Sequence, residues 1–157
     1  MNEDNTLYYE DALLTWKILS VIKQEHELEI ERMYRHVKVM DMEVDAVAVC
    51  RTTWQKRRRM IGFELKDSDI QKAILQAYLR RRFFDYFYII LNLRTSTIVS
   101  EILKLETHKI GFISSKDDVI VLPSKFQKRV EIPFEGRQID KNQVKLIKFL
   151  HENVGNK

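Results

Sequence analysis

Two acidic residues stand inside apolar runs that otherwise have the composition of buried β-strands. Asp45 lies in the middle of the Val/Ala-rich run 43–49, and Glu64 follows directly after the apolar run 60–63. An acid in the middle of an apolar strand is costly to bury unless another group pairs with it. The two acids therefore predict a hydrophilic corner on an otherwise apolar sheet, and this expectation constrains the fold more than any other feature.

The tripeptide Glu64-Leu65-Lys66 adds a cation to this corner. Side chains alternate between the two faces of a strand, so Glu64 and Lys66 point the same way while Leu65 points the other way. Two carboxylates and an ammonium group on paired strands could bind a divalent metal. Two plainer interpretations stay open: Asp45 pairs with a core arginine or lysine, or Glu64 and Lys66 form an ordinary surface pair.

Length and composition favour one soluble globular domain over residues 1–157. Hydrophobic residues make up 45% and charged residues 32%, which argues against disorder. No run of about 18 apolar residues is present, and the acidic N-terminus does not resemble a signal peptide. The single cysteine, Cys50, excludes an internal disulfide and a cysteine zinc cluster. We therefore expect an intracellular, cytoplasmic protein with no membrane partner.

Basic residues are concentrated in two clusters, at 56–59 and 80–82, within a chain of net charge +4. Such a distribution permits nucleic acid as a partner. Phosphate contacts position a nucleic acid without reading its sequence, and an aromatic side chain can stack on a base. We assign these roles to Arg57, Arg58, Arg59, Arg80 and Arg81 for phosphate and to Trp54 for stacking. The alternatives are that some arginines are merely solvated and that Trp54 packs on the sheet edge.

Hydrophobic periodicity predicts an α/β fold, a mixed central sheet with helices on both faces. The predicted helices are 8–24, 68–82, 97–106 and 140–153, and the predicted strands are 28–39, 43–51, 59–66, 85–93, 109–114 and 119–122. Ser68 with Gln71 fits a capping box, and Ser96 or Thr97 can cap the third helix. The strand–helix–strand unit 59–93 implies a right-handed crossover and a parallel pair. Residues 124–138 are basic and predicted to be irregular.

This order of elements, with Asp45 on the second strand and Glu64-Leu65-Lys66 on the third, resembles the PD-(D/E)XK nuclease superfamily. That resemblance implies the restriction-endonuclease-like αβββαβ core over about residues 8–122, and it leaves the basic segment and helix at 124–153 outside. Val44 stands where the family often has proline. The stretch 71–91 looks like archaeal and RecB-type members, so an archaeal or viral source is compatible with the sequence.

The resemblance implies a nuclease that hydrolyses DNA phosphodiester bonds with Mg²⁺ or Mn²⁺. Asp45, Glu64 and the main-chain carbonyl of Leu65 would hold the metal, whose preferred ligands are oxygens. Lys66 would lie against the attacking water and the scissile phosphate, where its ammonium stabilises developing negative charge. A homodimer is a further implied option, because family members that act on two strands often dimerise.

Two more residues take site roles through the same resemblance. Gln76 matches the glutamine that RecB-type members carry on the helix after the lysine, where it would orient a ligand or touch a phosphate. Glu10 is the best match for an additional acid on the first helix, and Asp11, Glu25 and Glu27 remain alternatives. Gln76 as an exposed helix residue and Glu10 as an ordinary first-turn acid are the plainer interpretations.

Two rival functions remain open at this point. The first is a nucleic-acid-binding protein with the same fold and no turnover, in which the arginine clusters carry the function. The second is a structural or partner-binding α/β module in which the acids simply pair with cations.

Overall fold

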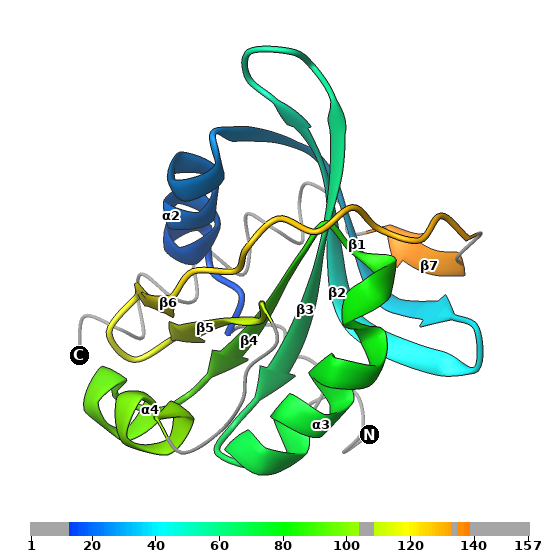
Figure 1. Ribbon diagram of the computed structural model, residues 1–157. Helices are drawn as coiled ribbons and strands as arrows, with labels where there is room; N and C mark the ends of the chain where they lie inside the picture. The colour runs from blue at the N-terminus through cyan, green and yellow to red at the C-terminus, as the bar shows by residue number, and fades with distance from the viewer. Residues whose placement is uncertain (1–12, 104–108, 133–134, 139–157) are drawn as a thin grey trace.

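A seven-stranded mixed sheet organises the computed structural model, which describes residues 13–103, 109–132 and 135–138 (Figure 1). The strand order is β6-β5-β4-β3-β2-β1-β7. The strands are β1 (Leu28–Val39), β2 (Met42–Thr52), β3 (Arg58–Lys66), β4 (Tyr86–Leu91), β5 (Gly111–Ser114), β6 (Val119–Leu122) and β7 (Glu135–Gln138). The helices are α2 (Trp16–His26), α3 (Ile70–Arg80) and α4 (Thr95–Ile102), with a 3₁₀ turn, η1 (Arg81–Phe83). The predicted α/β class with a mixed sheet is confirmed.

Strand directions follow the length of the connections. β1, β2 and β3 form an antiparallel meander, whereas β3, β4 and β5 are parallel. The predicted crossover is confirmed, because α3 lies between β3 and β4 and their parallel register runs from Ile61 opposite Tyr86 to Lys66 opposite Leu91. β6 and β7 close the two edges with antiparallel pairing.

The two faces of the sheet carry different helices. α2 packs Ile18, Leu19 and Ile22 into one apolar cluster, and α3 packs Ala73 and Ala77 into a second cluster. Alternation along β3 divides its residues accordingly: the buried apolar set facing α2 includes Phe63 and Leu65, so Glu64 and Lys66 face the α3 side. Among the described helices, none is long and apolar enough to cross a membrane.

The helix starts differ from the predicted ones because other side chains supply the caps. Thr15 caps α2 by accepting from Ile18 N at 3.3 Å, while residues 8–12 of the predicted helix lie outside the described ranges. Asp69 caps α3 by accepting from Lys72 N at 3.1 Å, so the predicted Ser68–Gln71 capping box is wrong. A carboxylate accepts the same orphan helix N–H groups as a serine hydroxyl does.

The hydrogen-bond donors at the start of α4 find their acceptor in a residue far away in the sequence. The predicted caps, Ser96 and Thr97, lie inside the helix, which begins at Thr95. Asp117, in the turn between β5 and β6, accepts from Thr95 N at 2.8 Å and from the Thr95 hydroxyl at 2.7 Å. These bonds lower the pKa of Asp117 below its usual range. Asp117 is 22 residues away from Thr95 in the sequence, so the residues around the helix do not predict this cap.

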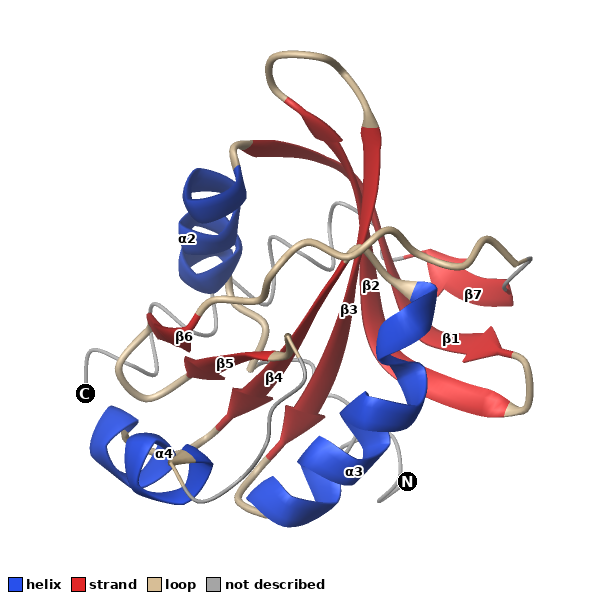
Figure 2. Cartoon of the chain, viewed as in Figure 1, coloured by secondary structure: helices blue, strands red, loops and turns tan. Residues whose placement is uncertain are grey.

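The segment predicted as irregular from 124 to 138 needs a correction at its end. β7 pairs with β1, with Tyr34 opposite Gln138, because the twelve-residue β1 offers an edge that a further strand can cover. The preceding residues 123–132 are indeed irregular and run from β6 across the sheet toward its β1 edge (Figure 2). The predicted helix 140–153 lies outside the described residues.

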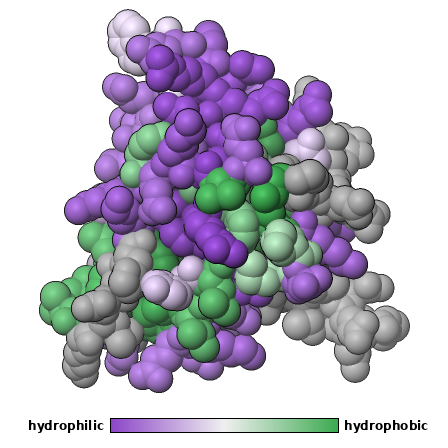
Figure 3. All heavy atoms as spheres, turned by 45° about the vertical axis from the view of Figure 1, so that its right-hand side comes forward, coloured by the Kyte–Doolittle hydropathy of each residue, from purple (hydrophilic) through white to green (hydrophobic). Residues whose placement is uncertain are grey.

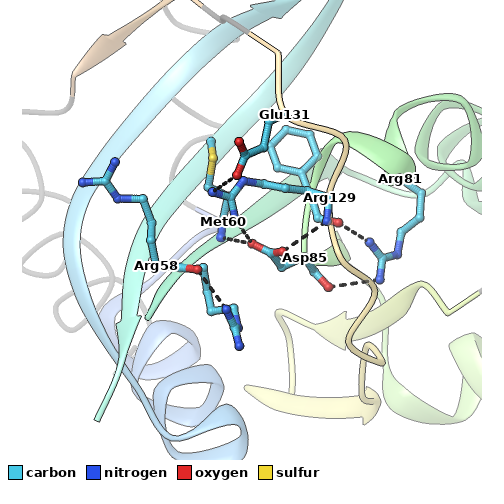
Figure 4. A network of polar contacts seen from close by, with 8 residues as sticks. Arg58, Met60, Arg81, Asp85, Arg129 and Glu131 are labelled. Atoms are coloured by element: carbon cyan, nitrogen blue, oxygen red, sulfur yellow. Dashed lines mark hydrogen bonds and ion pairs between the residues drawn. The ribbon is translucent and has the colours of Figure 1, made fainter. Parts of the chain in front are cut away.

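A buried carboxylate, Asp85, fixes this crossing segment. Its Oδ2 accepts from Met60 N and from Arg129 Nη1, both at 2.7 Å, and its Oδ1 accepts from Arg129 N at 3.3 Å. Gln127 N donates to the main-chain carbonyl of Asp85 at 3.0 Å. Figure 4 shows Arg129 lying between Asp85 and Glu131, with Arg81 on the other side of Asp85. One carboxylate therefore connects β3, β4 and the segment 123–132.

Asp85→Ala should destabilise the fold by about 3–5 kcal/mol, because it leaves the buried Arg129 and Met60 N without their acceptor. Urea denaturation followed by circular dichroism measures this change. Glu131→Ala is the matched control, since its side chain is 76% exposed and pairs with the same Arg129 at 3.4 Å. We expect less than about 1 kcal/mol from the control. Equal effects of the two variants would contradict a structural role for Asp85.

Candidate functional site

The candidate site forms where β2 and β3 stop pairing. Their ladder ends at Ala46 opposite Phe63, and one residue beyond it Asp45 and Glu64 come together. Leu65 N donates to Asp45 Oδ2 at 2.8 Å instead of to the β2 main chain. The N–H and C=O of one strand residue point to the same side of the strand, so the Leu65 carbonyl also faces the Asp45 side. The structure thus brings together three predicted groups: two carboxylates and one carbonyl.

Glu64 is the most perturbed acid of this group. Its residue is 2% exposed, and burial, followed by the charge of Asp45 and a side-chain hydrogen bond with Asp45, raises its pKa to about 9. Arg80 opposes the shift, with its Nε 3.5 Å from Glu64 Oε1. The burial and the neighbouring acid dominate, so Glu64 holds a proton at neutral pH in the metal-free protein.

Arg80 belongs to this site rather than to a phosphate-binding surface. Its side chain is 13% exposed, and its guanidinium donates from Nε to Glu43 O at 2.8 Å and from Nη1 to Gln76 O at 2.9 Å. The prediction of Arg80 as a surface phosphate contact is therefore corrected. The helical i, i+4 spacing from Gln76 was the sequence signal for this placement, because it puts both residues on one face of α3.

Two buried oxygens near the site have no hydrogen bond in the described part of the chain. Glu64 Oε1 and Gln76 Oε1 are buried and have no hydrogen-bond partner among the described residues, and Arg80 meets Glu64 Oε1 only as an ion pair at 3.5 Å. Buried polar atoms are nearly always hydrogen-bonded, so each exception calls for an explanation such as an ion or a ligand. Lys66, half-buried at the end of β3, lies on the same strand face as Glu64.

The described part of α2 does not bring the acid expected from the first helix to the site. Glu10 and its alternative Asp11 lie outside the described residues. Glu25 lies in the last turn of α2, and Glu27 caps its C-terminus. Both belong to the helix that packs on the other face of the sheet from Glu64. Glu25 and Glu27 are therefore removed as candidates for a third carboxylate.

The predicted nucleic-acid contacts separate into two groups. Arg57 and Arg58 are exposed at the β2–β3 hairpin, and Trp54 is 84% exposed at its tip, so the interpretation that Trp54 packs on the sheet edge is wrong. The upper end of the molecule, where this hairpin lies, is hydrophilic (Figure 3). Arg58 is six residues from Glu64, or roughly 20 Å along a strand. The hairpin and the carboxylates therefore occupy opposite ends of β3.

Arg59 and Arg81 are engaged within the protein. The Arg59 guanidinium lies 4.7 Å from the centroid of the Phe126 ring. Arg81 is 4% exposed, and its guanidinium donates to the carbonyls of Phe84 at 2.6 Å, Asp85 at 3.2 Å and Lys125 at 2.7 Å. Arg81 is thus not available to a phosphate, and its prediction as a nucleic-acid contact is corrected: a 3₁₀ turn directs it inward.

The donor set suits a cation that keeps part of its water shell. Across the described residues, no group of three or more His, Cys, Asp or Glu side chains is gathered as a metal cage. Mg²⁺ is typically bound by one or two carboxylates and retains several waters. Asp45, Glu64 and the Leu65 carbonyl fit this pattern, and Glu64 Oε1, which has no hydrogen bond among the described residues, is an oxygen that such a cation would bind.

Comparisons with known proteins leave the family open. No protein-family model matches the chain, and no curated protein matches it. A solved protein of unknown function from Silicibacter pomeroyi is 8% identical, with 89% of this chain and 84% of that chain covered and a TM-score of 0.37. A similarity at this level carries no argument about fold family or activity.

Glu64→Gln should raise the free energy of unfolding of the metal-free protein more at pH 9 than at pH 5. The pKa of Glu64 lies above its unfolded value, so the folded state binds the extra proton and its stability falls as pH rises from about 5 to about 9. Glutamine carries no titrating proton and removes this slope. Urea denaturation in EDTA at several pH values measures the difference, expected to reach at least about 1 kcal/mol. A difference independent of pH would contradict the raised pKa.

Proposed function

We propose that this protein is a metal-dependent nuclease that hydrolyses DNA phosphodiester bonds, with a core of the PD-(D/E)XK type. The observation that carries the proposal is the pairing of Asp45 with Glu64 on adjacent strands, where the Leu65 N–H holds Asp45 at 2.8 Å. The element order α2-β1-β2-β3-α3-β4 supports it, because it has the helix and strand sequence of that core.

The site residues have three roles in this proposal: metal binding, charge stabilisation and positioning of the carboxylate. Asp45, Glu64 and the Leu65 carbonyl would hold Mg²⁺ or Mn²⁺, which would supply an activated water and charge neutralisation for the developing and leaving oxygens. Loss of the Glu64 proton makes this carboxylate available as a ligand. Lys66, on the same strand face, stabilises negative charge on the phosphate as its bonds change. Arg80, which is held by the Gln76 main-chain carbonyl on α3, lies against Glu64 and so positions the carboxylate.

Asp45→Asn and Glu64→Gln should each lower DNA cleavage at least about 10³-fold, since each removes a metal-binding charge. The assay incubates linear and circular double-stranded DNA with Mg²⁺, with Mn²⁺ and with EDTA. Asp41→Asn is the matched control, an exposed acid in the β1–β2 turn four residues before Asp45. Metal-dependent cleavage by wild type and Asp41→Asn alone supports the nuclease, and survival of the circle makes it an exonuclease. Cleavage that persists in both site variants would overturn the assignment.

One observation favours the alternative of a nucleic-acid-binding protein without turnover. Arg80 lies 3.5 Å from Glu64, so a cationic side chain already stands beside the carboxylate where the nuclease needs a metal ion. This alternative predicts that DNA binding is equal in Mg²⁺ and in EDTA, falls steeply with salt and survives Asp45→Asn, with no cleavage under any condition. Gel retardation beside the cleavage assay distinguishes the two functions.

A further inference from the structure

A hollow of about 250 Å³ lies beside the segment that Asp85 anchors. Its floor is apolar and buried, formed by Val39, Met60, Phe83 and Phe84. The other lining residues are Arg58 and the run 129–132, which includes Arg129, Val130, Glu131 and Ile132. This volume is slightly below the roughly 300–1,000 Å³ of pockets that take drug-sized molecules. The hollow therefore suits a ligand of about one ring system rather than a drug-sized molecule.

Two exposed cations lie at the edge of this apolar floor. Arg58 lines the hollow, and the guanidinium of Arg82 lies 4.7 Å from the centroid of the Phe83 ring, which also lines it. We call Arg58 and Arg82 the basic rim. With Arg129 they make three cations against two carboxylates, Asp85 and Glu131, both of which pair with Arg129. The surroundings of the hollow thus favour an anion next to an apolar ring.

We propose that the hollow binds one unpaired nucleotide of a nucleic acid, with the base on the apolar floor and its phosphates on the basic rim. A base offers a flat apolar face to Met60, Phe83 and Phe84, and the backbone offers the negative charge that Arg58 and Arg82 complement. The Glu131 carboxylate at the edge can accept from an exocyclic amino group of the base. A paired base must first leave its stack and lose its pairing, so a single strand is the preferred ligand.

The position of the hollow relates it to the candidate site. Met60 and Glu64 lie four residues apart on the same face of β3, or about 13 Å. Measured along the axis of a B-form duplex, that distance is the rise over about four nucleotides of one strand, at roughly 3.4 Å each. The substrate class that follows, a frayed or single-stranded end held near the scissile phosphate, rests on the proposed function. The binding of the nucleotide itself does not.

The test measures fluorescence anisotropy of wild type with a short labelled single strand and with a blunt duplex of the same sequence, in EDTA. Arg58→Ala should weaken single-strand binding about tenfold, or ~1.4 kcal/mol, and change the ratio of single-strand to duplex affinity. Arg57→Ala, the adjacent exposed arginine that does not line the hollow, is the matched control and should leave that ratio unchanged.

A second pair of variants tests the hollow rather than the charge. Val130 is 52% exposed and lines the hollow, so Val130→Met should fill it and lower single-strand affinity about tenfold, whereas Val130→Ala should retain it. A nucleoside monophosphate should compete with the strand where inorganic phosphate at equal ionic strength does not. Equal affinity for single strand and duplex in wild type, or no effect of Val130→Met, overturns the proposal. Because EDTA prevents metal-dependent cleavage, these outcomes are independent of whether the protein is a nuclease.

Discussion

The hydrogen bonds of Asp85 hold three distant parts of the chain in one place. The carboxylate precedes β4, accepts from the main chain of β3 at Met60, and pairs with Arg129 from the irregular segment 123–132. A buried charge is stable when a partner charge and hydrogen bonds compensate its lost hydration, and here the pairing meets that condition. The parallel placement of β4 beside β3 and the path of the chain toward β7 both depend on this compensation.

Glu64, on the same strand as Met60, shows the opposite situation. Arg80 at 3.5 Å and Lys66 compensate its charge only in part, its Oε1 has no hydrogen bond among the described residues, and a second acid lies beside it. Such incomplete compensation raises the pKa of Glu64 to about 9, a perturbation typical of functional sites. The contrast between a fully paired Asp85 and an incompletely paired Glu64 is the physical reason to treat the first as structural and the second as a candidate site.

Both proposals use β3 as their common element. Its end carries the carboxylates and Lys66, and its beginning carries Arg58 and Met60 at the hollow. The helix α3 and the 3₁₀ turn after it supply the second half of each site, because Arg80 lies against Glu64 and Phe83 lines the hollow. A rigid strand and helix therefore separate a candidate metal-binding end from a basic end by a distance that a nucleic-acid strand can span.

Local patterning was sufficient to predict the class of fold and the strands that carry Asp45, Glu64 and Lys66, because alternation and apolar runs are properties of neighbouring residues. It also put Glu64 and Lys66 on one strand face. Only the tertiary structure decided which groups the arginines contact. Arg80 and Arg81 are adjacent in sequence, yet Arg80 lies against Glu64 and Arg81 donates to three carbonyls. Sequence patterns also did not predict the cap of α4 by Asp117, the strand β7 or the hollow beside Arg129. Each depends on contacts between residues far apart in the chain, and no local window contains the partner.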